Sequence, residues 1–266
     1  MTTTTLPTIS PDLKGVLRQL RLSPVLDVLP ERLLQARQLQ MPHQDFLLLV
    51  LQDETSRRDG QAATLRARRA ALDPDARLEL WDDDAAVHYD RSLLSELATL
   101  RFLEARQNVT IVGPVGVGKT FLAHALGHIA CRRRLSVLAV RTDKLLKSLQ
   151  QARVDNSYDA ELRRLVAVDL LIGDDFGLDL MPPTESRDAY DILVERHRSG
   201  SMIITSNRGP DEWLATFADP VRAQGAIDRF TSTAYDLVIE GESYRQRLKP
   251  GRAAQSRGST GGRRTG

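Results

Sequence analysis

Cysteine and long hydrophobic runs are scarce in this chain of 266 residues. Its single cysteine, Cys131, excludes an internal disulfide and stands apart from any metal-ligand spacing, so we expect a buried thiol in a reducing cytoplasm. The longest purely apolar run, Phe46 to Leu51, is far shorter than the roughly 20 residues that cross a bilayer. The first residues carry neither the basic nor the apolar region of a secretion signal. These features predict a cytoplasmic protein without a membrane partner.

Lysine and aromatic residues are also rare. Aromatic residues make up 5% of the chain, and only five of the 37 Lys and Arg residues are lysine. Two interpretations of this arginine bias stay open. The planar guanidinium suits phosphate and nucleic acid, whereas a genome rich in G and C produces the same bias without functional meaning. The net charge of +2, with 41% hydrophobic and 27% charged residues, is typical of a globular protein and excludes a disordered or collagen-like chain.

Helical periodicity in about the first 80 residues predicts a small all-helical N-terminal domain over residues 1–80. Pro24 and Pro30 are expected to divide it into short helices, and Pro42 suits the first turn of the helix that follows. Behind that helix lies a group of arginines that is either a solvated helix face or a phosphate-facing surface. Its members are Arg57, Arg58, Arg66, Arg68, Arg69 and Arg77.

A change of pattern follows the acidic stretch that begins at Trp81, and we place a linker at residues 81–90. Residues 91–248 then show short apolar runs that alternate with longer helix-like segments, which predicts an α/β domain with a parallel sheet covered on both faces. The expected strands are 109–112, 136–140, 168–172, 202–205 and 236–239. Residues 249–266 are rich in glycine and basic residues, so we expect a disordered basic tail.

The strongest functional motif is Gly113-Pro-Val-Gly-Val-Gly-Lys-Thr120, which matches G-x-x-x-x-G-K-[ST] between a predicted strand and a predicted helix. Glycines allow the loop to turn its N–H groups toward phosphates at a helix N-terminus. Lys119 is expected to reach the β- and γ-phosphates of ATP, and Thr120 to hold Mg²⁺. The predicted nucleotide-binding residues are Gly113, Pro114, Val115, Gly116, Val117, Gly118, Lys119, Thr120 and Phe121. The motif predicts a P-loop NTPase fold with ATP and Mg²⁺ as cofactors.

Polar side chains follow two further predicted strands. Asp174 and Asp175 end one apolar run, and Asn207 follows the next. Ligands of open α/β sheets sit beside the carboxyl ends of the strands. We therefore expect Asp174 to bind Mg²⁺ with Thr120, and Asp175 to polarise the water that attacks the γ-phosphate. Asn207 is expected to orient that water or to sense the phosphate.

The order of these motifs resembles the IstB-like transposition helper ATPases, which are relatives of the helicase loader DnaC and the initiator DnaA within the AAA+ superfamily. The segments that carry the resemblance are 17–23, 97–100, 113–120, 170–175, 205–207, 228–229 and 241–245. The resemblance implies an oligomer with ATP at subunit interfaces, Arg229 as an arginine finger and Arg245 as a nucleotide-sensing residue. Most of the superfamily carries glutamate where this chain has Asp175, and the shorter side chain predicts slow hydrolysis.

The resemblance also implies a DNA-binding segment between residues 143 and 164, which contacts phosphates without reading sequence, on duplex DNA above all. Its candidate contacts are Lys144, Lys147, Arg153, Arg163 and Arg164. The alternative is a pair of solvated helices with ion pairs to the acidic residues of the same segment. Arg132 to Arg134 form a second candidate surface.

These interpretations together predict an ATP-dependent DNA-binding ATPase that assembles on DNA and assists a cognate transposase. Two alternatives stay open: a helicase loader similar to DnaC, and a nucleotide-gated DNA clamp with little hydrolysis. A small-molecule kinase is disfavoured because the chain offers no obvious acceptor pocket.

Overall fold

The computed structural model describes residues 6–82 and 87–244, and Arg245 and the expected basic tail lie outside them. The chain forms two compact units, and the division falls between Thr64 and Leu65. Among the described residues, no helix combines the length and the apolar character that a membrane span needs.

The first unit consists of α1 (Pro11–Gln19), α2 (Val25–Gln38) and the greater part of α3 (His43–Arg69). Its small core joins Val25 and Leu29 of α2 to Val50 of α3. Farther along α3, hydrogen bonds from Arg57 and Arg58 hold the pKa of the Glu54 carboxyl at about 2. The expected helical fold of this region is confirmed.

Pro30 does not divide the helices as predicted, because it lies inside α2. A proline in a helix interior costs about 3 kcal/mol through its missing N–H and its steric clash. Val25 and Leu29 are buried on the same helix, and each buried aliphatic side chain stabilises by about 2 kcal/mol. Tertiary packing thus offsets the local preference that the prediction relied on. Pro24 does precede the first residue of α2, and Pro42 precedes α3.

The second unit contains a five-stranded parallel sheet with the strand order β3-β4-β5-β2-β6. The strands are β2 (Asn108–Val112), β3 (Val137–Arg141), β4 (Leu170–Asp174), β5 (Ser201–Ser206) and β6 (Ala234–Val238). Each overlaps one of the expected runs. The parallel arrangement brings the carboxyl ends of all five strands to one edge of the sheet.

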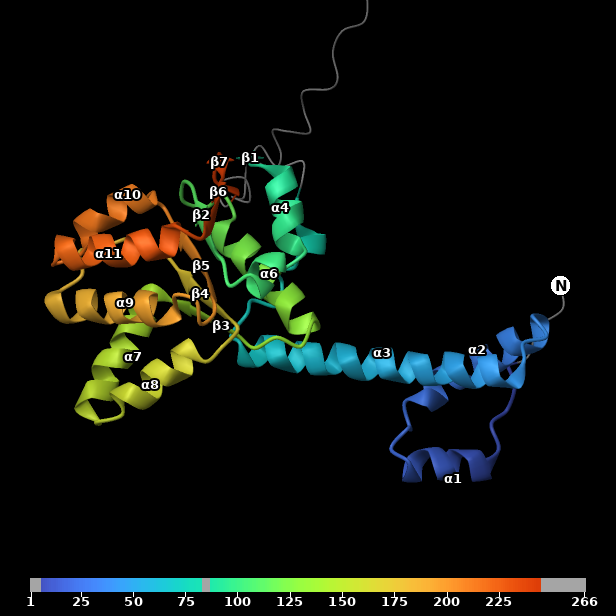
Figure 1. Cartoon of the computed structure of the whole chain (residues 1–266). Coiled ribbons are helices and arrows are strands. Elements are labelled where there is room, and N and C mark those ends of the chain that lie inside the picture. Colours follow the sequence, from blue (N-terminus) through green and yellow to red (C-terminus); the bar gives the residue numbers. More distant parts are fainter. Residues whose placement is uncertain (1–5, 83–86, 245–266) are drawn as a thin grey trace, which may run out of the picture. The chain divides into compact units, whose positions relative to one another are not determined.

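Helices cover both faces of this sheet, as Figure 1 shows. One face packs against α4 (Arg91–Ala98), α5 (Arg101–Glu104) and α6 (Lys119–Arg132). The other packs against α7 (Thr142–Val154), α8 (Tyr158–Val166), α9 (Pro183–Arg196), α10 (Pro210–Trp213) and α11 (Pro220–Thr231). Successive residues of a strand point to opposite faces, so Ile172 lies in the first core and Leu171 in the second. The predicted three-layer architecture is confirmed.

The division between the units falls earlier than the domain boundary expected at residue 80. Ala67, Ala70 and Leu72 pack into the core of the second unit, and Ala139 of β3 donates a backbone hydrogen bond to Ala70. The end of α3 and the short helix η1 (Leu78–Leu80) therefore belong to the α/β unit. Helical periodicity continues through the end of α3, so the sequence pattern alone did not separate this stretch from the first unit.

The expected linker contains structure on both sides of its undescribed residues. Trp81 packs against Tyr89 and Phe121, and its indole N–H donates a 2.9 Å hydrogen bond to the Tyr89 hydroxyl. Strand β1 (Val87–His88) pairs antiparallel with β7 (Glu240–Gly241). Strands of two residues are too short to leave a periodic signal in the sequence.

Candidate functional site

The glycine-rich loop joins the end of β2 to the start of α6 at the carboxyl edge of the sheet. Gly116 and Gly118 have φ values of +85° and +103°, which residues with a side chain rarely adopt. A Cβ at Gly116 would lie 2.1 Å from Ser243 Oγ, and one at Gly118 would lie 2.6 Å from the Trp81 ring. The loop therefore requires glycine both for its backbone and for close contact with neighbouring segments.

Lys119 is the first residue of α6, and its side chain is buried beneath the loop. Its ammonium group donates hydrogen bonds to the carbonyl oxygens of Gly113 at 2.8 Å and Pro114 at 2.7 Å, and to Asn207 Oδ1 at 2.6 Å. Asn207 follows the end of β5, which lies next to β2 in the sheet. Two predicted site residues distant in sequence are thus in direct contact.

Asp174 ends β4 and is buried, with 8% of its surface exposed. Its Oδ1 accepts a hydrogen bond of 2.8 Å from the Thr120 hydroxyl and one of 2.5 Å from the Thr205 hydroxyl, and neither bond uses Oδ2. A carboxylate beside a hydroxyl provides the hard oxygen ligands that Mg²⁺ prefers. Thr120 and Asp174 therefore suit the metal-binding role that the sequence predicted for them.

Asp175 adopts a left-handed conformation with φ of +58°. Its backbone N–H donates a 3.0 Å hydrogen bond to Thr205 Oγ1, the same hydroxyl that donates to Asp174. Asp and Asn tolerate this conformation better than longer side chains do. Phe176, the next residue, is buried against Trp213 and anchors the chain after the turn.

Three residues that the sequence interpretation left without a role lie at this site. Thr205 holds Asp174 and Asp175 together, Trp81 lies against Gly118, and the Tyr244 N–H donates a 2.8 Å hydrogen bond to the Gly116 carbonyl. Thr205 and Tyr244 fell within quoted motifs. Trp81 had no local signal, because its position in the expected linker indicated solvent.

Of the two predicted arginines, Arg229 lies in the part of the chain that the structure describes. Arg229 is exposed on α11, and its guanidinium donates a 2.8 Å hydrogen bond to the Gly225 carbonyl of the same helix. Arg245 lies outside the described residues.

The predicted DNA-binding residues fall on α7 and α8. Lys144, Lys147 and Arg163 are exposed, although Lys147 lies 4.0 Å from Asp143 on the same helix. Arg164 donates two hydrogen bonds to Glu161, as the alternative interpretation expected. These helices thus combine exposed basic side chains with intrahelical ion pairs.

Arg153 has a structural position instead. It pairs with Asp188, which is fully buried, and lies over the Tyr158 ring at 3.9 Å. Freeing the guanidinium for a phosphate would leave a buried carboxylate without its charged partner. We therefore remove Arg153 from the candidate DNA contacts.

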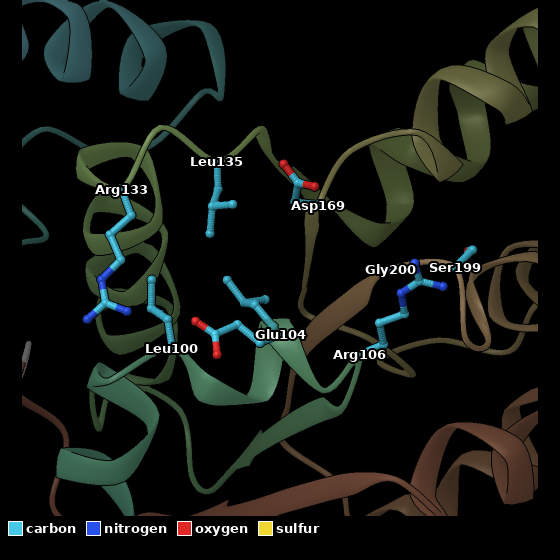
Figure 2. A pocket seen from close by; sticks show the side chains of 9 residues that line it. Leu100, Glu104, Arg106, Arg133, Leu135, Asp169, Ser199 and Gly200 are labelled. Atoms are coloured by element: carbon cyan, nitrogen blue, oxygen red, sulfur yellow. The ribbon is translucent and has the colours of Figure 1, made fainter.

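In the second candidate surface, Arg132 to Arg134, side chains also interact with other parts of the protein. Arg132 pairs with Glu79 at 3.0 Å, and Arg133 donates a hydrogen bond to the Thr99 carbonyl. Arg133 lines a pocket of about 290 Å³ at the amino edge of the sheet, opposite the glycine-rich loop. Figure 2 shows Glu104 between Arg133 and Arg106 in this pocket. None of the predicted nucleotide-site residues lines it.

Comparison with known proteins places this geometry in a family context. Residues 15–251 match the family described as IstB-like ATP-binding proteins. A protein of Mycobacterium tuberculosis described as an ATP-binding protein in an insertion sequence is 37% identical over 91% of this chain and 97% of its own length. An ATP-binding protein of the insertion sequence IS21 from Pseudomonas aeruginosa is 35% identical over 81% of each chain.

Solved structures share the fold of the second unit. The DnaC helicase loader aligns with a TM-score of 0.52 and 20% identity, over 62% of this chain and 97% of that chain. Domain III of the initiator DnaA from Thermotoga maritima aligns with a TM-score of 0.52 and 23% identity, over 64% of this chain and 68% of that chain. The α/β unit therefore has the fold of AAA+ P-loop domains.

Proposed function

The chain belongs to the IstB-like ATP-binding protein family of IS21-type insertion sequences, and we propose that it is a Mg²⁺-dependent ATPase that assembles on DNA and assists a cognate transposase. One observation carries this proposal above all others. At one edge of the sheet, the start of α6 is joined to the ends of two strands: Lys119 bonds to Asn207, which follows β5, and Thr120 bonds to Asp174, which ends β4.

Binding of ATP depends on the loop from Gly113 to Thr120. Its N–H groups at the α6 N-terminus attract phosphate oxygens, and glycine at 116 and 118 permits the positive φ values that the loop adopts. Lys119 exchanges a hydrogen bond with a loop carbonyl for one with the β- and γ-phosphates. Phe121, with Trp81 against it, forms the wall beside the loop.

Thr120 and Asp174 are the proposed ligands of Mg²⁺, whose chemistry is to neutralise charge on the phosphates. The hydroxyls of Thr120 and Thr205 hold Asp174 through Oδ1, so its orientation is fixed before the nucleotide arrives. A carboxylate that is already oriented loses little freedom on binding, which favours tight and specific metal coordination.

Hydrolysis requires a water to attack the γ-phosphorus as the bond to the β,γ-bridging oxygen breaks, which releases ADP and phosphate. Asp175 is the proposed group that orients this water and accepts its proton.

Asn207, in contact with Lys119, is the proposed sensor of the γ-phosphate. Arg229 is the proposed finger that reaches ATP on an adjacent subunit, and its exposure suits a role in trans. Arg245 is proposed to contact the nucleotide from the segment that follows Tyr244.

DNA binding is proposed for the exposed face of α7 and α8, through Lys144, Lys147, Arg163 and Arg164. Contacts of this kind neutralise phosphates without reading bases, so the affinity for DNA falls steeply with salt.

The helical N-terminal unit is proposed to contact neighbouring subunits, DNA or the transposase. Eight of the large hydrophobic side chains in the described part of this unit are exposed, so they are available for contact with a partner. They are Leu6, Leu13, Val16, Leu20, Leu39, Leu47, Leu48 and Leu51.

The decisive experiment measures ATP hydrolysis by the purified full-length protein with and without duplex DNA, while light scattering follows assembly. Turnover that DNA stimulates, together with assembly that ATP induces, is the expected result, and both should disappear in Lys119→Ala. Assembly without turnover would instead make the protein a nucleotide-gated clamp. Absence of any response to DNA would overturn the DNA-binding part of the proposal.

A further inference from the structure

The junction between β3 and α7 contacts the proposed metal-binding residue directly. Strand β3 ends at Arg141 and α7 begins at Thr142, so no loop residue separates them. Thr142 is buried, and its hydroxyl donates a 3.0 Å hydrogen bond to the main-chain carbonyl of Asp174. Arg141 and Asp174 are partners in the register of β3 and β4. The start of α7 is therefore attached to the end of the strand that carries the metal ligand.

This hydroxyl is not used for capping its own helix. The residue at the N-cap position of α7 is Arg141, which makes no side-chain capping bond, and the Thr142 hydroxyl points to the neighbouring strand instead. Threonine commonly caps a helix from the N-cap position, whereas Thr142 is the first residue of α7 and its hydroxyl is available for another partner. The Thr142 hydroxyl instead fixes the start of α7 relative to Asp174.

Asp174 is thus held at two separate points. Its side chain is fixed by the hydroxyls of Thr120 and Thr205, and its main chain is fixed by Thr142. Any displacement of Asp174 that accompanies nucleotide binding changes the geometry of the bond to Thr142.

Helix α7 can carry such a displacement to its outer face. Leu145, Leu146 and Leu149 are buried on its inner face, so a displacement at the start of the helix would move the whole helix rather than single residues. Lys144 and Lys147 are exposed on the same helix within two turns of Thr142. The proposed metal site and the proposed DNA-binding surface are therefore joined through one helix and one hydrogen bond.

We infer that Thr142 is a positioning residue that couples ATP binding at Asp174 to DNA binding by α7. This inference rests on the proposed function. Coupling between two binding sites is reciprocal, so DNA must raise the affinity for ATP by the same factor by which ATP raises the affinity for DNA. Couplings of this kind amount to about fivefold or more.

The test measures the dissociation constant of Mg-ATP with and without a duplex of random sequence, and takes the ratio of the two. We expect a ratio of about five or more in the wild-type protein. Thr142→Val removes the hydroxyl and keeps the shape, and it should bring the ratio close to one. Thr142→Ser keeps the hydroxyl and should restore the wild-type ratio, which a purely steric role of the side chain would not do.

The matched control is Thr216→Val, since Thr216 is fully buried and its hydroxyl donates a 2.7 Å hydrogen bond to the Trp213 carbonyl. It should keep the wild-type ratio, and thermal melting checks that every variant is folded. Thr142→Ala serves as a second variant without the hydroxyl if valine disturbs the junction.

Two outcomes would overturn the inference, and they are distinguishable. A wild-type ratio that persists in the folded Thr142 variants lacking the hydroxyl, or that is lost equally in Thr216→Val, refutes the role of Thr142 and leaves the proposed function standing. A wild-type ratio of one means that ATP and DNA do not influence each other's binding, and then the ATP-dependent assembly on DNA proposed above fails as well.

Discussion

At the scale of single residues, three threonine hydroxyls determine how Asp174 is held. Thr120 and Thr205 donate to its carboxylate, and Thr142 donates to its carbonyl. Hydrogen bonds to an ionised acceptor are stronger than those between neutral groups, so the two bonds to Oδ1 contribute most to its orientation. Thr205 also accepts the N–H of Asp175 and so links the proposed metal ligand to the proposed base.

Asp175 provides the first prediction, through its left-handed backbone at φ of +58°. Asp175→Glu extends the carboxylate by one methylene toward the attacking water, and we expect kcat to rise roughly tenfold. Glutamate tolerates this conformation less well than aspartate, so the free energy of unfolding should fall by about 1 kcal/mol. Steady-state kinetics and urea denaturation measure the two effects.

The control for this prediction is Asp175→Asn, which keeps the size of the side chain and removes its basicity. Its kcat should fall by about a hundredfold. A variant Asp175→Glu that hydrolyses ATP more slowly than the wild type would show that the shorter carboxylate is already well placed, and the expectation of slow hydrolysis would be wrong.

The sequence predicted the residues of the site whose chemistry depends on a local pattern. The glycine-rich loop has a fixed spacing, Asp174 ends a buried strand, and Asp175 and Asn207 directly follow buried strands. Thr205 fell within a quoted motif without a predicted role, and Thr142 had no local signal, because the partners of both depend on which strands are neighbours in the sheet. A single sequence does not encode that order locally.

At the scale of elements, the parallel strands were predictable since each contains a short run rich in apolar residues. Elements whose formation depends on partners distant in the sequence were not predictable. Strand β1 exists because β7 pairs with it, and α2 continues through Pro30 because Val25 and Leu29 are buried. The second prediction concerns α7. Burial of Leu145, Leu146 and Leu149 leaves the opposite face of this helix exposed.

Neutralising Lys144 and Lys147 together should weaken DNA binding and reduce its dependence on salt. Each phosphate contact contributes about 0.9 to the slope of log affinity against log salt, so the double variant Lys144→Gln with Lys147→Gln should lower that slope by roughly 1.8. Fluorescence anisotropy with a duplex at several salt concentrations gives the slope. Arg222→Gln, which removes an exposed charge from α11, is the control. An unchanged slope in the double variant would exclude α7 as the phosphate-binding helix.

At the scale of the whole molecule, the exposure of Arg229 predicts an active site that is complete only between subunits. Arg229→Ala should reduce ATP hydrolysis by about 10³-fold while ATP binding is retained. Arg222→Ala, on the same exposed helix, is the control, since its guanidinium lies 3.4 Å from Asp219 and has no proposed catalytic role.

Mixing variants separates action in trans from action within one subunit. Arg229→Ala subunits have an intact Asp175, and Asp175→Asn subunits have an intact Arg229. A mixture of the two should regain part of the activity that each lacks alone, because some interfaces combine both functional residues. Two inactive variants that stay inactive when mixed would contradict a shared site.

The position of β2 between β5 and β6 has a consequence for how the protein is made. This strand leads into the glycine-rich loop, and Val109 pairs with Ile203 of β5 on one side and Tyr235 of β6 on the other. A nascent chain leaving the ribosome therefore carries the complete loop long before either neighbouring strand has been synthesised. Contacts so distant in sequence form late in folding. The capacity to hold ATP is consequently among the last properties that a newly made chain acquires, and the nucleotide cannot guide the early steps of its folding.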